Sequence, residues 1–179
     1  EALGDLEKFW NTPSPLPLVV RLALVHYQFE AIHPFLDGNG RIGRALIVLL
    51  LCAEKMLPEP MLYLSAYFER NRSEYYRLLL AVSREGLWSE WVSFFLRGVA
   101  EQSQDAVLRA GKLLALWQEY RRKFQAARSS ALLLKLVDEL FDRPFITITG
   151  ASDALGVTYR AAQLNVDKLV EAGILQPLG

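Results

Sequence analysis

Residues 33–44 read HPFLDGNGRIGR and bring together side chains that could act on a phosphate ester. Histidine takes up and releases protons near neutral pH, so His33 could accept the proton of a hydroxyl group as that group attacks phosphorus. Asp37 could hold Mg²⁺ against the phosphates, because hard cations prefer carboxylate and phosphate oxygens. The segment therefore predicts an enzyme that uses a nucleoside triphosphate.

The glycines and arginines of the same segment suit the binding of phosphate groups. Gly38, Asn39 and Gly40 can adopt the backbone conformations that turn successive N–H groups inward as an anion nest. A helix that begins near Arg41 adds the positive end of its dipole. Arg41 and Arg44 lie on one side of its first turn, where both guanidinium groups can bind phosphate oxygens.

Other kinds of site share features with this segment. Its three glycines spell the G-x-G-x-x-G of a dinucleotide fold, but a predicted helix precedes them and no second strand follows. The Gly-Lys-Ser/Thr of a P-loop is missing. A metal site made of His26, His33 and Asp37 has enough ligands, yet Pro34 interrupts the helix face that would align them. We expect His26 to be a structural residue.

Composition places the chain among globular proteins, and its charge argues against strong binding to nucleic acid. Hydrophobic residues make up 52% and charged residues 22%, and the formal net charge is zero. Residues 1–100 hold 10 Lys and Arg against 11 Asp and Glu, residues 101–128 hold 6 against 3, and residues 131–179 hold 4 against 6. Strong binding to a nucleic-acid backbone usually needs a clear positive excess, which only the middle stretch has.

The apolar run at residues 45–53 contains the lone Cys52. It is about half as long as a membrane span and predicts no contact with a membrane. The cysteine is expected to be a small buried hydrophobic residue, and no disulfide can form within the chain. The residues before this run do not have the pattern of a signal peptide, so a cytoplasmic location is predicted.

Apolar residues at helical spacing predict an almost entirely helical chain. A helix over residues 18–32 stops at His33, because Pro34 disfavours helical geometry in the residue before it. Residues 41–55 are apolar on nearly every side, which predicts a central helix surrounded by others. Amphipathic helices are expected to pack on it over residues 65–84 and 88–99.

The predicted domains are a main domain at residues 1–100, a linker helix at 101–130 and a small domain at 131–179. The small domain combines helices with one alternating stretch, ITIT at 146–149, that predicts a strand. Its order resembles a winged helix-turn-helix domain. The expected elements are a helix at 131–141, the strand, a short helix at 152–155, a turn at Gly156, a helix at 158–172 and a hairpin wing that starts at 173–175.

A winged helix suggests an alternative function, a transcriptional regulator that binds DNA. The residues expected to contact DNA lie on the second helix of the motif: Thr158, Tyr159, Arg160, Gln163 and Asn165. The acidic balance of residues 131–179 argues against strong binding. Dimerisation, as a homodimer, or docking of a target protein are alternative roles for this domain.

The motif HPFLDGNGRIGR matches the Fic-family pattern H-P-F-x-[DE]-G-N-[GK]-R-x-x-R at every defined position. The flanking segments DLEKF at 5–9, LVHYQFE at 24–30 and YLSAYFERNR at 63–72 also resemble Fic proteins with a C-terminal winged helix. The resemblance implies a helical Fic fold over residues 1–100. It also implies transfer of AMP from ATP to a Ser, Thr or Tyr hydroxyl of a target protein, with pyrophosphate leaving.

By the same resemblance His33 is the general base and Asp37 the Mg²⁺ ligand. Pro34 and Phe35 shape and anchor the loop. The nest formed by residues 38–40 holds phosphate, and the two arginines bind the distal phosphates. Family members that phosphorylate their targets carry Lys at the position of Gly40, so AMP transfer is favoured, and removal of AMP stays open.

Two features of Fic enzymes are not found in this sequence. One is a β-hairpin flap ahead of the motif, and the other is an inhibitory helix with the pattern [ST]-x-x-x-E-[GN]. The nearest candidate, SREG at residues 83–86, has the wrong spacing. We therefore expect the sequence to be the C-terminal part of a longer protein.

Overall fold

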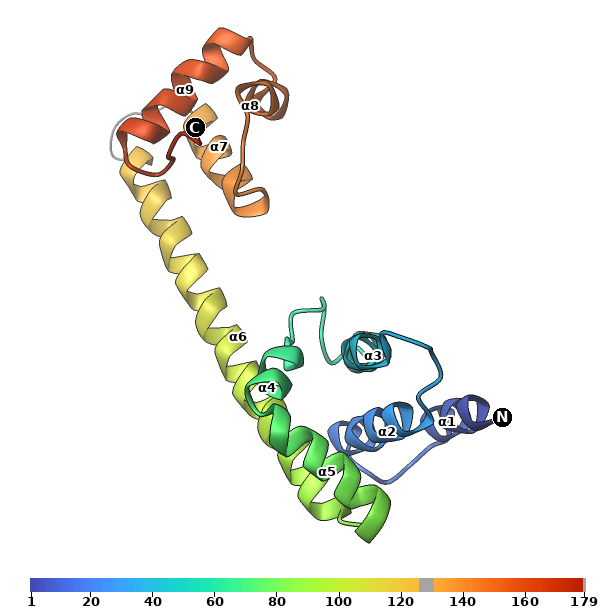
Figure 1. Cartoon of the computed structure of the whole chain (residues 1–179). Coiled ribbons are helices and arrows are strands. Elements are labelled where there is room, and N and C mark those ends of the chain that lie inside the picture. Colours follow the sequence, from blue (N-terminus) through green and yellow to red (C-terminus); the bar gives the residue numbers. More distant parts are fainter. Residues whose placement is uncertain (126–130, 179) are drawn as a thin grey trace. The chain divides into compact units, whose positions relative to one another are not determined.

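The chain folds into helices joined by short connections. A computed structural model describes residues 1–125 and 131–178, and within these ranges every regular element is a helix. The predicted mainly α fold is therefore confirmed. The helices are α1 (Ala2–Asn11), α2 (Leu18–Ile32), α3 (Asn39–Ala53), α4 (Leu64–Arg70), α5 (Arg72–Glu85), α6 (Trp88–Gln125), α7 (Ala131–Asp142), α8 (Ile148–Leu155) and α9 (Tyr159–Glu171) (Figure 1). None of the described helices is long and apolar enough to cross a membrane.

Two compact units make up the chain, Glu1–Leu108 and Arg109–Gly179. Helix α6 crosses the division without a break. The sequence predicted a helix at 88–99 and a separate linker helix at 101–130. The break between them is wrong, because Gly98 costs a long helix only about 1 kcal/mol. Residues 126–130, the end of the predicted linker, lie outside the described residues.

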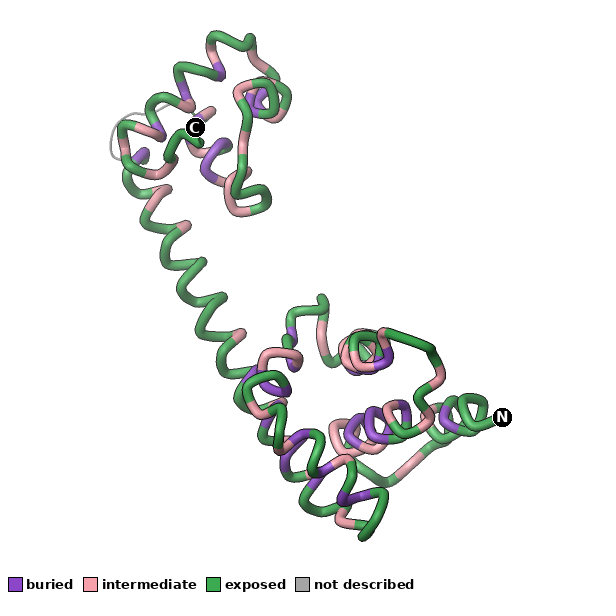
Figure 2. Tube along the Cα trace, viewed as in Figure 1, coloured by how far each residue is buried: buried purple, intermediate pink, exposed green. Residues whose placement is uncertain are grey.

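The N-terminal unit is held together by aromatic side chains. Buried residues line α2, α5 and the first part of α6 (Figure 2). Trp91 is fully buried, and its indole N–H donates a hydrogen bond to the carbonyl of Ala23 over 2.9 Å. Its neighbours in this core are Leu22, Tyr67, Phe68, Tyr75, Leu78, Phe94 and Phe95. This core fixes α2, the helix that ends at the motif.

Helix α3 carries the second half of the motif, and only one side of it is buried. The buried residues, Asn39, Gly43, Ile47 and Leu51, recur every fourth position. On the opposite side, Leu49 is 62% exposed. The prediction of a helix surrounded on all sides is therefore wrong, because a run of uniformly apolar residues gives no contrast that marks its outer face. Cys52, expected to be buried, is only partly so.

The predicted helix at 65–84 is two helices, α4 and α5, that meet at Asn71. The backbone of Asn71 leaves helical geometry, and its side-chain amide donates a hydrogen bond to the carbonyl of Tyr67 over 2.9 Å. Asparagine favours such local bonds to the backbone, which end one helix and begin the next. As a result α4 is a short helix, and Ser65 in its first turn contacts Arg44 of the motif.

The C-terminal unit contains the predicted helix-turn-helix arrangement in α8 and α9, joined at Gly156. The predicted strand at 146–149 is wrong. Thr147 accepts a hydrogen bond from the backbone N–H of Gly150 over 3.0 Å and begins α8, so the capping threonine outweighs the alternating pattern. The described residues after Gly173 form neither a strand nor a hairpin wing.

Candidate functional site

His33 lies at the junction of α2 and the motif loop, in a backbone conformation that few side chains adopt. It is the C-cap of α2, with φ 49° and ψ 57°, and its N–H donates to the carbonyl of Phe29 over 3.1 Å. Left-handed geometry in a residue other than glycine marks a position that its surroundings force. The imidazole is thereby exposed beyond the end of the helix, as predicted from Pro34.

The side chain of Asn39 closes the motif loop from within. It is buried, accepts a hydrogen bond from the N–H of Phe35 over 2.8 Å and donates one to the carbonyl of Phe35 over 2.6 Å. The Phe35 ring in turn contacts Phe29 of α2, with the ring centroids 6.3 Å apart. These contacts tie the loop between His33 and α3 to both helices and fix its shape.

The N-terminus of α3 has the features of an anion site. Gly38 is its N-cap, with a positive φ of 82°, and no side chain caps the helix among the described residues. The guanidinium groups of Arg41 and Arg44 fold back over the glycines. A Cβ added to Gly38 would lie 3.4 Å from Nη2 of Arg41, and a Cβ added to Gly40 would lie 3.0 Å from Nη1 of Arg44.

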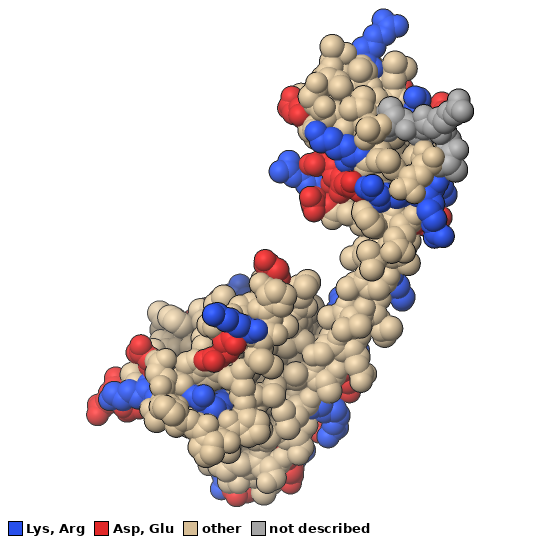
Figure 3. Space-filling model, turned by 180° about the vertical axis from the view of Figure 1, so that it is seen from behind, with Lys and Arg blue, Asp and Glu red and all other residues tan. Residues whose placement is uncertain are grey.

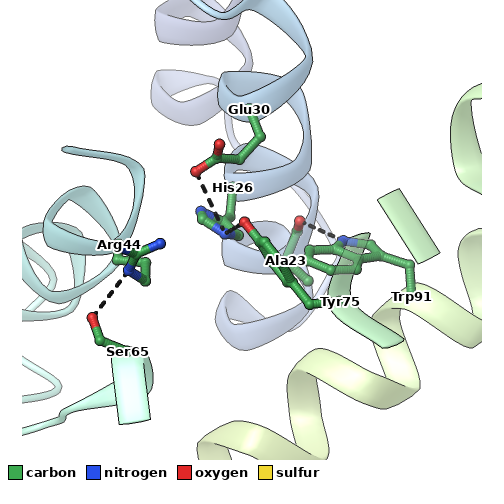
Figure 4. A network of polar contacts seen from close by, with 7 residues as sticks. All are labelled: Ala23, His26, Glu30, Arg44, Ser65, Tyr75 and Trp91. Carbon is green, nitrogen blue, oxygen red and sulfur yellow. Dashed lines mark hydrogen bonds and ion pairs between the residues drawn. The ribbon is translucent and has the colours of Figure 1, made fainter. Parts of the chain in front are cut away.

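The two arginines differ in how firmly they are held. Arg41 donates a hydrogen bond to Asp37 over 3.2 Å, and both side chains are exposed. An exposed ion pair of this kind adds little stability, and water can readily replace either partner. Arg44 is partly buried, and its Nε donates to the hydroxyl of Ser65, in the first turn of α4, over 3.1 Å (Figure 4).

Behind the loop, α2, α3 and α5 enclose a buried polar network (Figure 4). Nε2 of His26 lies 3.0 Å from the Tyr75 hydroxyl and 4.0 Å from the Glu30 carboxylate. Burial lowers the pKa of His26 to about 3, so this histidine is neutral. Burial likewise raises the pKa of Tyr75 and that of Glu30, and the charge of Arg44 opposes the shift at Glu30. His26 is the structural residue that the sequence predicted.

A close approach of α3 to α2 brings Glu30 to the motif. A Cβ added to Gly43 would lie 2.5 Å from Oε1 of Glu30 and 3.3 Å from Cε1 of His26. That oxygen is buried and has no hydrogen-bond partner among the described residues. The carboxylate therefore lies against the turn of α3 that carries Arg44. This is why the guanidinium charge acts on its pKa.

A cavity of about 310 Å³ opens beside His33, between α2 and α5. Its lining is mostly aromatic and aliphatic, with a few polar groups, as in pockets that bind small molecules. The lining residues are Tyr27, Glu30, Ala31, His33, Tyr76, Leu79, Leu80 and Ser83. The imidazole of His33 therefore lines a mostly apolar cavity. In sequence, His33 precedes the nest at residues 38–40 by five residues.

Asp37 is the carboxylate of the motif loop, and the described residues hold no group of three or more His, Cys, Asp or Glu that could bind a metal by themselves. Mg²⁺ is often held by one or two carboxylates together with the phosphates of a substrate. A single exposed carboxylate beside an anion nest fits a metal that arrives with a nucleotide. It does not fit a resident metal centre built from His26, His33 and Asp37.

Sequence reasoning missed Glu30, Ser65 and Tyr75. The signal for Glu30 was available, because it follows His26 by four residues and so lies on the same face of α2. Ser65 lies in the Fic-like segment at 63–72, but no local pattern places it or Tyr75 at the motif, since α4 and α5 reach the motif only through the tertiary fold. The structure thus adds a second layer of polar residues behind the predicted ones.

Only some of the residues predicted to contact DNA are exposed and free of contacts within α9. Tyr159, Arg160 and Gln163 are exposed. The hydroxyl of Thr158 is the N-cap of α9, and Asn165 is buried, with its amide bonded to the carbonyl of Ala161 over 2.8 Å, so the prediction for Asn165 is wrong. Acidic and basic side chains both lie on the face of this unit seen in Figure 3.

Comparisons with known proteins agree with the motif. Residues 1–51 match the model of the Fic/DOC family. The chain is 32% identical over 111 residues to protein adenylyltransferase fic-1 of Caenorhabditis elegans, which covers 61% of the chain and 20% of that protein.

Two further relatives carry similar names. Protein adenylyltransferase Fic of Nematostella vectensis is 29% identical over 132 residues, covering 69% of the chain and 29% of that protein. A probable protein adenylyltransferase of Aquifex aeolicus is 43% identical over 42 residues, or 24% of the chain and 13% of that protein. The matched region thus spans less than a third of the length of each of these relatives.

Proposed function

We propose that this chain carries the active site of a Fic-type protein adenylyltransferase, which transfers AMP from ATP to a Ser, Thr or Tyr hydroxyl of a target protein. The observation that carries the proposal is the placement of two guanidinium groups over the glycines of an uncapped helix N-terminus, close in sequence to His33. The similarity to named adenylyltransferases supports the same reaction.

The proposed reaction is a displacement at the α-phosphorus of ATP. The hydroxyl oxygen of the target forms a bond to this phosphorus, and the bond from the α-phosphorus to the oxygen that bridges it to the β-phosphorus breaks. Pyrophosphate leaves with the electron pair of that bond, and the hydroxyl proton passes to the imidazole of His33. General-base assistance of this kind is worth about 10²–10⁴ in rate.

Each part of the site has one role in this reaction. The N–H groups of Gly38, Asn39 and Gly40 donate hydrogen bonds to the phosphate oxygens. Arg41 and Arg44 bind the distal phosphates, which carry the charge of the leaving group. We assign the nucleoside to the cavity beside His33, whose aromatic and aliphatic lining suits a planar base.

Asp37 would hold Mg²⁺ that arrives with ATP. The metal neutralises phosphate charge when bound. Pro34 and Phe35 would keep His33 and Asp37 at a fixed separation, through the bonds from Asn39 and the contact with Phe29. A glycine at position 40 leaves room for the Arg44 guanidinium over the nest. In line with the family resemblance, this residue favours AMP transfer over phosphorylation.

Two differently labelled forms of ATP test the proposal. The full-length protein that contains this chain is incubated with Mg²⁺ and with ATP labelled at either the α- or the γ-phosphate. We expect the α label on the protein or on a target, no transfer of the γ label, and loss of labelling by at least 10²-fold in His33→Ala. Transfer of the γ label would show phosphorylation instead. Absence of both labels, or α labelling unchanged in His33→Ala, would overturn the proposal.

A further inference from the structure

The arginine that ends the motif is held by a residue outside it. Nε of Arg44 donates to the hydroxyl of Ser65 over 3.1 Å, and 21 positions separate the two residues in sequence. Arg41, in contrast, donates a hydrogen bond to Asp37, four residues earlier in the motif. Arg44 is thus the motif arginine whose position depends on a helix outside the motif.

The position of Ser65 is set by the core and not by the motif. Tyr67, two residues along α4, is buried and packs directly on α6, where a Cβ added to Gly98 would lie 2.5 Å from its Cδ1. Gln102 of α6 is also buried, and its amide can donate to the carbonyl of Tyr63 over 2.9 Å. Contacts on both sides of Ser65 therefore anchor α4 to α6.

A guanidinium group has five N–H donors in a fixed planar fork, and one of them lies at Nε. The bond to Ser65 uses this donor and so orients the plane of the fork. The four donors at Nη1 and Nη2 form no hydrogen bond with the described residues and can therefore bind phosphate, with Nη1 over Gly40. The Glu30 carboxylate faces the same arginine from α2 and supplies the opposite charge.

We propose that Ser65 is a positioning residue for Arg44: its hydroxyl fixes the guanidinium plane so that the outer N–H groups point to the distal phosphates of the nucleotide. This inference rests on the proposed function. It applies to ATP, which has distal phosphates, and not to AMP, which has none. The hydroxyl of Ser65 does not contact the nucleotide in this arrangement.

Nucleotide affinity separates this role from a general structural one. With the whole chain and Mg²⁺, calorimetric titration of Ser65→Ala should show a three- to tenfold higher Kd for ATP, about the effect of one hydrogen bond, and a Kd for AMP within about twofold of wild type. Ser65→Thr keeps the hydroxyl and should restore ATP binding. Ser93→Ala, an exposed serine of α6, is the matched control and should bind both nucleotides like wild type.

A second measurement needs no nucleotide. In the ¹⁵N spectrum of the free chain, the Nε–H of Arg44 should exchange slowly with solvent in wild type and in Ser65→Thr, and at least severalfold faster in Ser65→Ala. Equal exchange in wild type and Ser65→Ala would overturn the inference. So would equal loss of ATP and AMP affinity in Ser65→Ala, which would indicate a disturbed fold.

The two proposals fail in different ways. If wild type binds ATP and Arg44→Ala weakens that binding while Ser65→Ala does not, only the role of Ser65 is refuted. If wild type binds neither nucleotide but the Nε–H exchange behaves as expected, Ser65 holds Arg44 and the proposed function is wrong.

Discussion

Substitution of Gly98 by alanine is expected to destabilise the N-terminal unit, although alanine is the better helix former. Gly98 lies within α6, where alanine alone would stabilise the helix by about 1 kcal/mol. The added Cβ would, however, lie 2.5 Å from Cδ1 and 2.8 Å from Cε1 of Tyr67. Tyr67 is 2% exposed and contacts Phe68 and Phe94, so its ring cannot turn away freely.

The expected net effect follows from the two contributions. Overpacking a filled core costs about 1–3 kcal/mol, and the helix preference offsets about 1 kcal/mol of this. The free energy of unfolding should therefore fall by up to about 2 kcal/mol. Gly4→Ala, in the same unit, is the matched control, because its Cβ would meet nothing within 4 Å. It should raise the free energy of unfolding by up to about 1 kcal/mol.

Denaturant unfolding of the whole chain, followed by tryptophan fluorescence and by circular dichroism, measures both variants. Two signals are needed because the chain has two compact units and can unfold in two steps. Gly98→Ala should lower the denaturant concentration at which half of the N-terminal unit is unfolded, and Gly4→Ala should raise it. An equal rise in stability in both variants would refute the packing of α4 against α6. The support proposed for Ser65 would then be lost as well.

Three further substitutions test the polar contacts. Tyr75→Phe leaves Nε2 of the neutral, buried His26 without its hydroxyl partner and should lower the free energy of unfolding by about 1–3 kcal/mol in denaturant titrations. Glu30→Gln should raise the free energy of unfolding at pH 7. The pKa of Glu30 is raised in the folded protein, so ionisation of this carboxyl at pH 7 opposes folding, and glutamine cannot ionise. The difference between the variant and wild type should vanish as the pH falls to about 4. For Asp138 the sign is reversed. Burial favours a higher pKa, but hydrogen bonds from Arg121 and Trp117 outweigh it and lower the pKa. Asp138→Asn should therefore destabilise the C-terminal unit at pH 7, and the difference should shrink progressively as the pH falls below about 4 and through the lowered pKa of Asp138. Thermal unfolding across pH that shows no such trend would contradict this.

The sequence predicted the parts of the site that are local and missed those that depend on the tertiary fold. Pro34 ends α2 through a clash with its direct neighbour, so the exposure of His33 could be derived from two residues. The arginines and glycines at 38–44 belong to one helix start, and their spacing fixes which of them lie together. No such local rule brings Ser65 to Arg44.

Errors in the fold have two other origins, a local capping signal that outweighed periodicity and apolar runs without contrast between helix faces. The ITIT stretch at 146–149 has the period of a strand, yet the Thr147 hydroxyl caps α8 and the residues after it become helical. Uniformly apolar residues in α3 concealed which side faces the core. Asn165 belongs to the helix predicted to read DNA, but its position along α9 turns it inward. Periodicity thus indicated most of the helices but missed α1 and the start of α8, and it did not indicate which face of α3 or α9 is buried.

We propose that ATP binds at the N-terminus of α3 with its base in the cavity beside His33. Backbone amide chemical shifts of the ¹⁵N-labelled chain, recorded as ATP and Mg²⁺ are added, test this most directly. We expect the largest changes at Gly38, Gly40 and Arg41, with further changes at Leu79 and Leu80, and a weaker response in Arg44→Ala. Changes confined to α8 and α9, or no saturable change at residues 38–44, would contradict it.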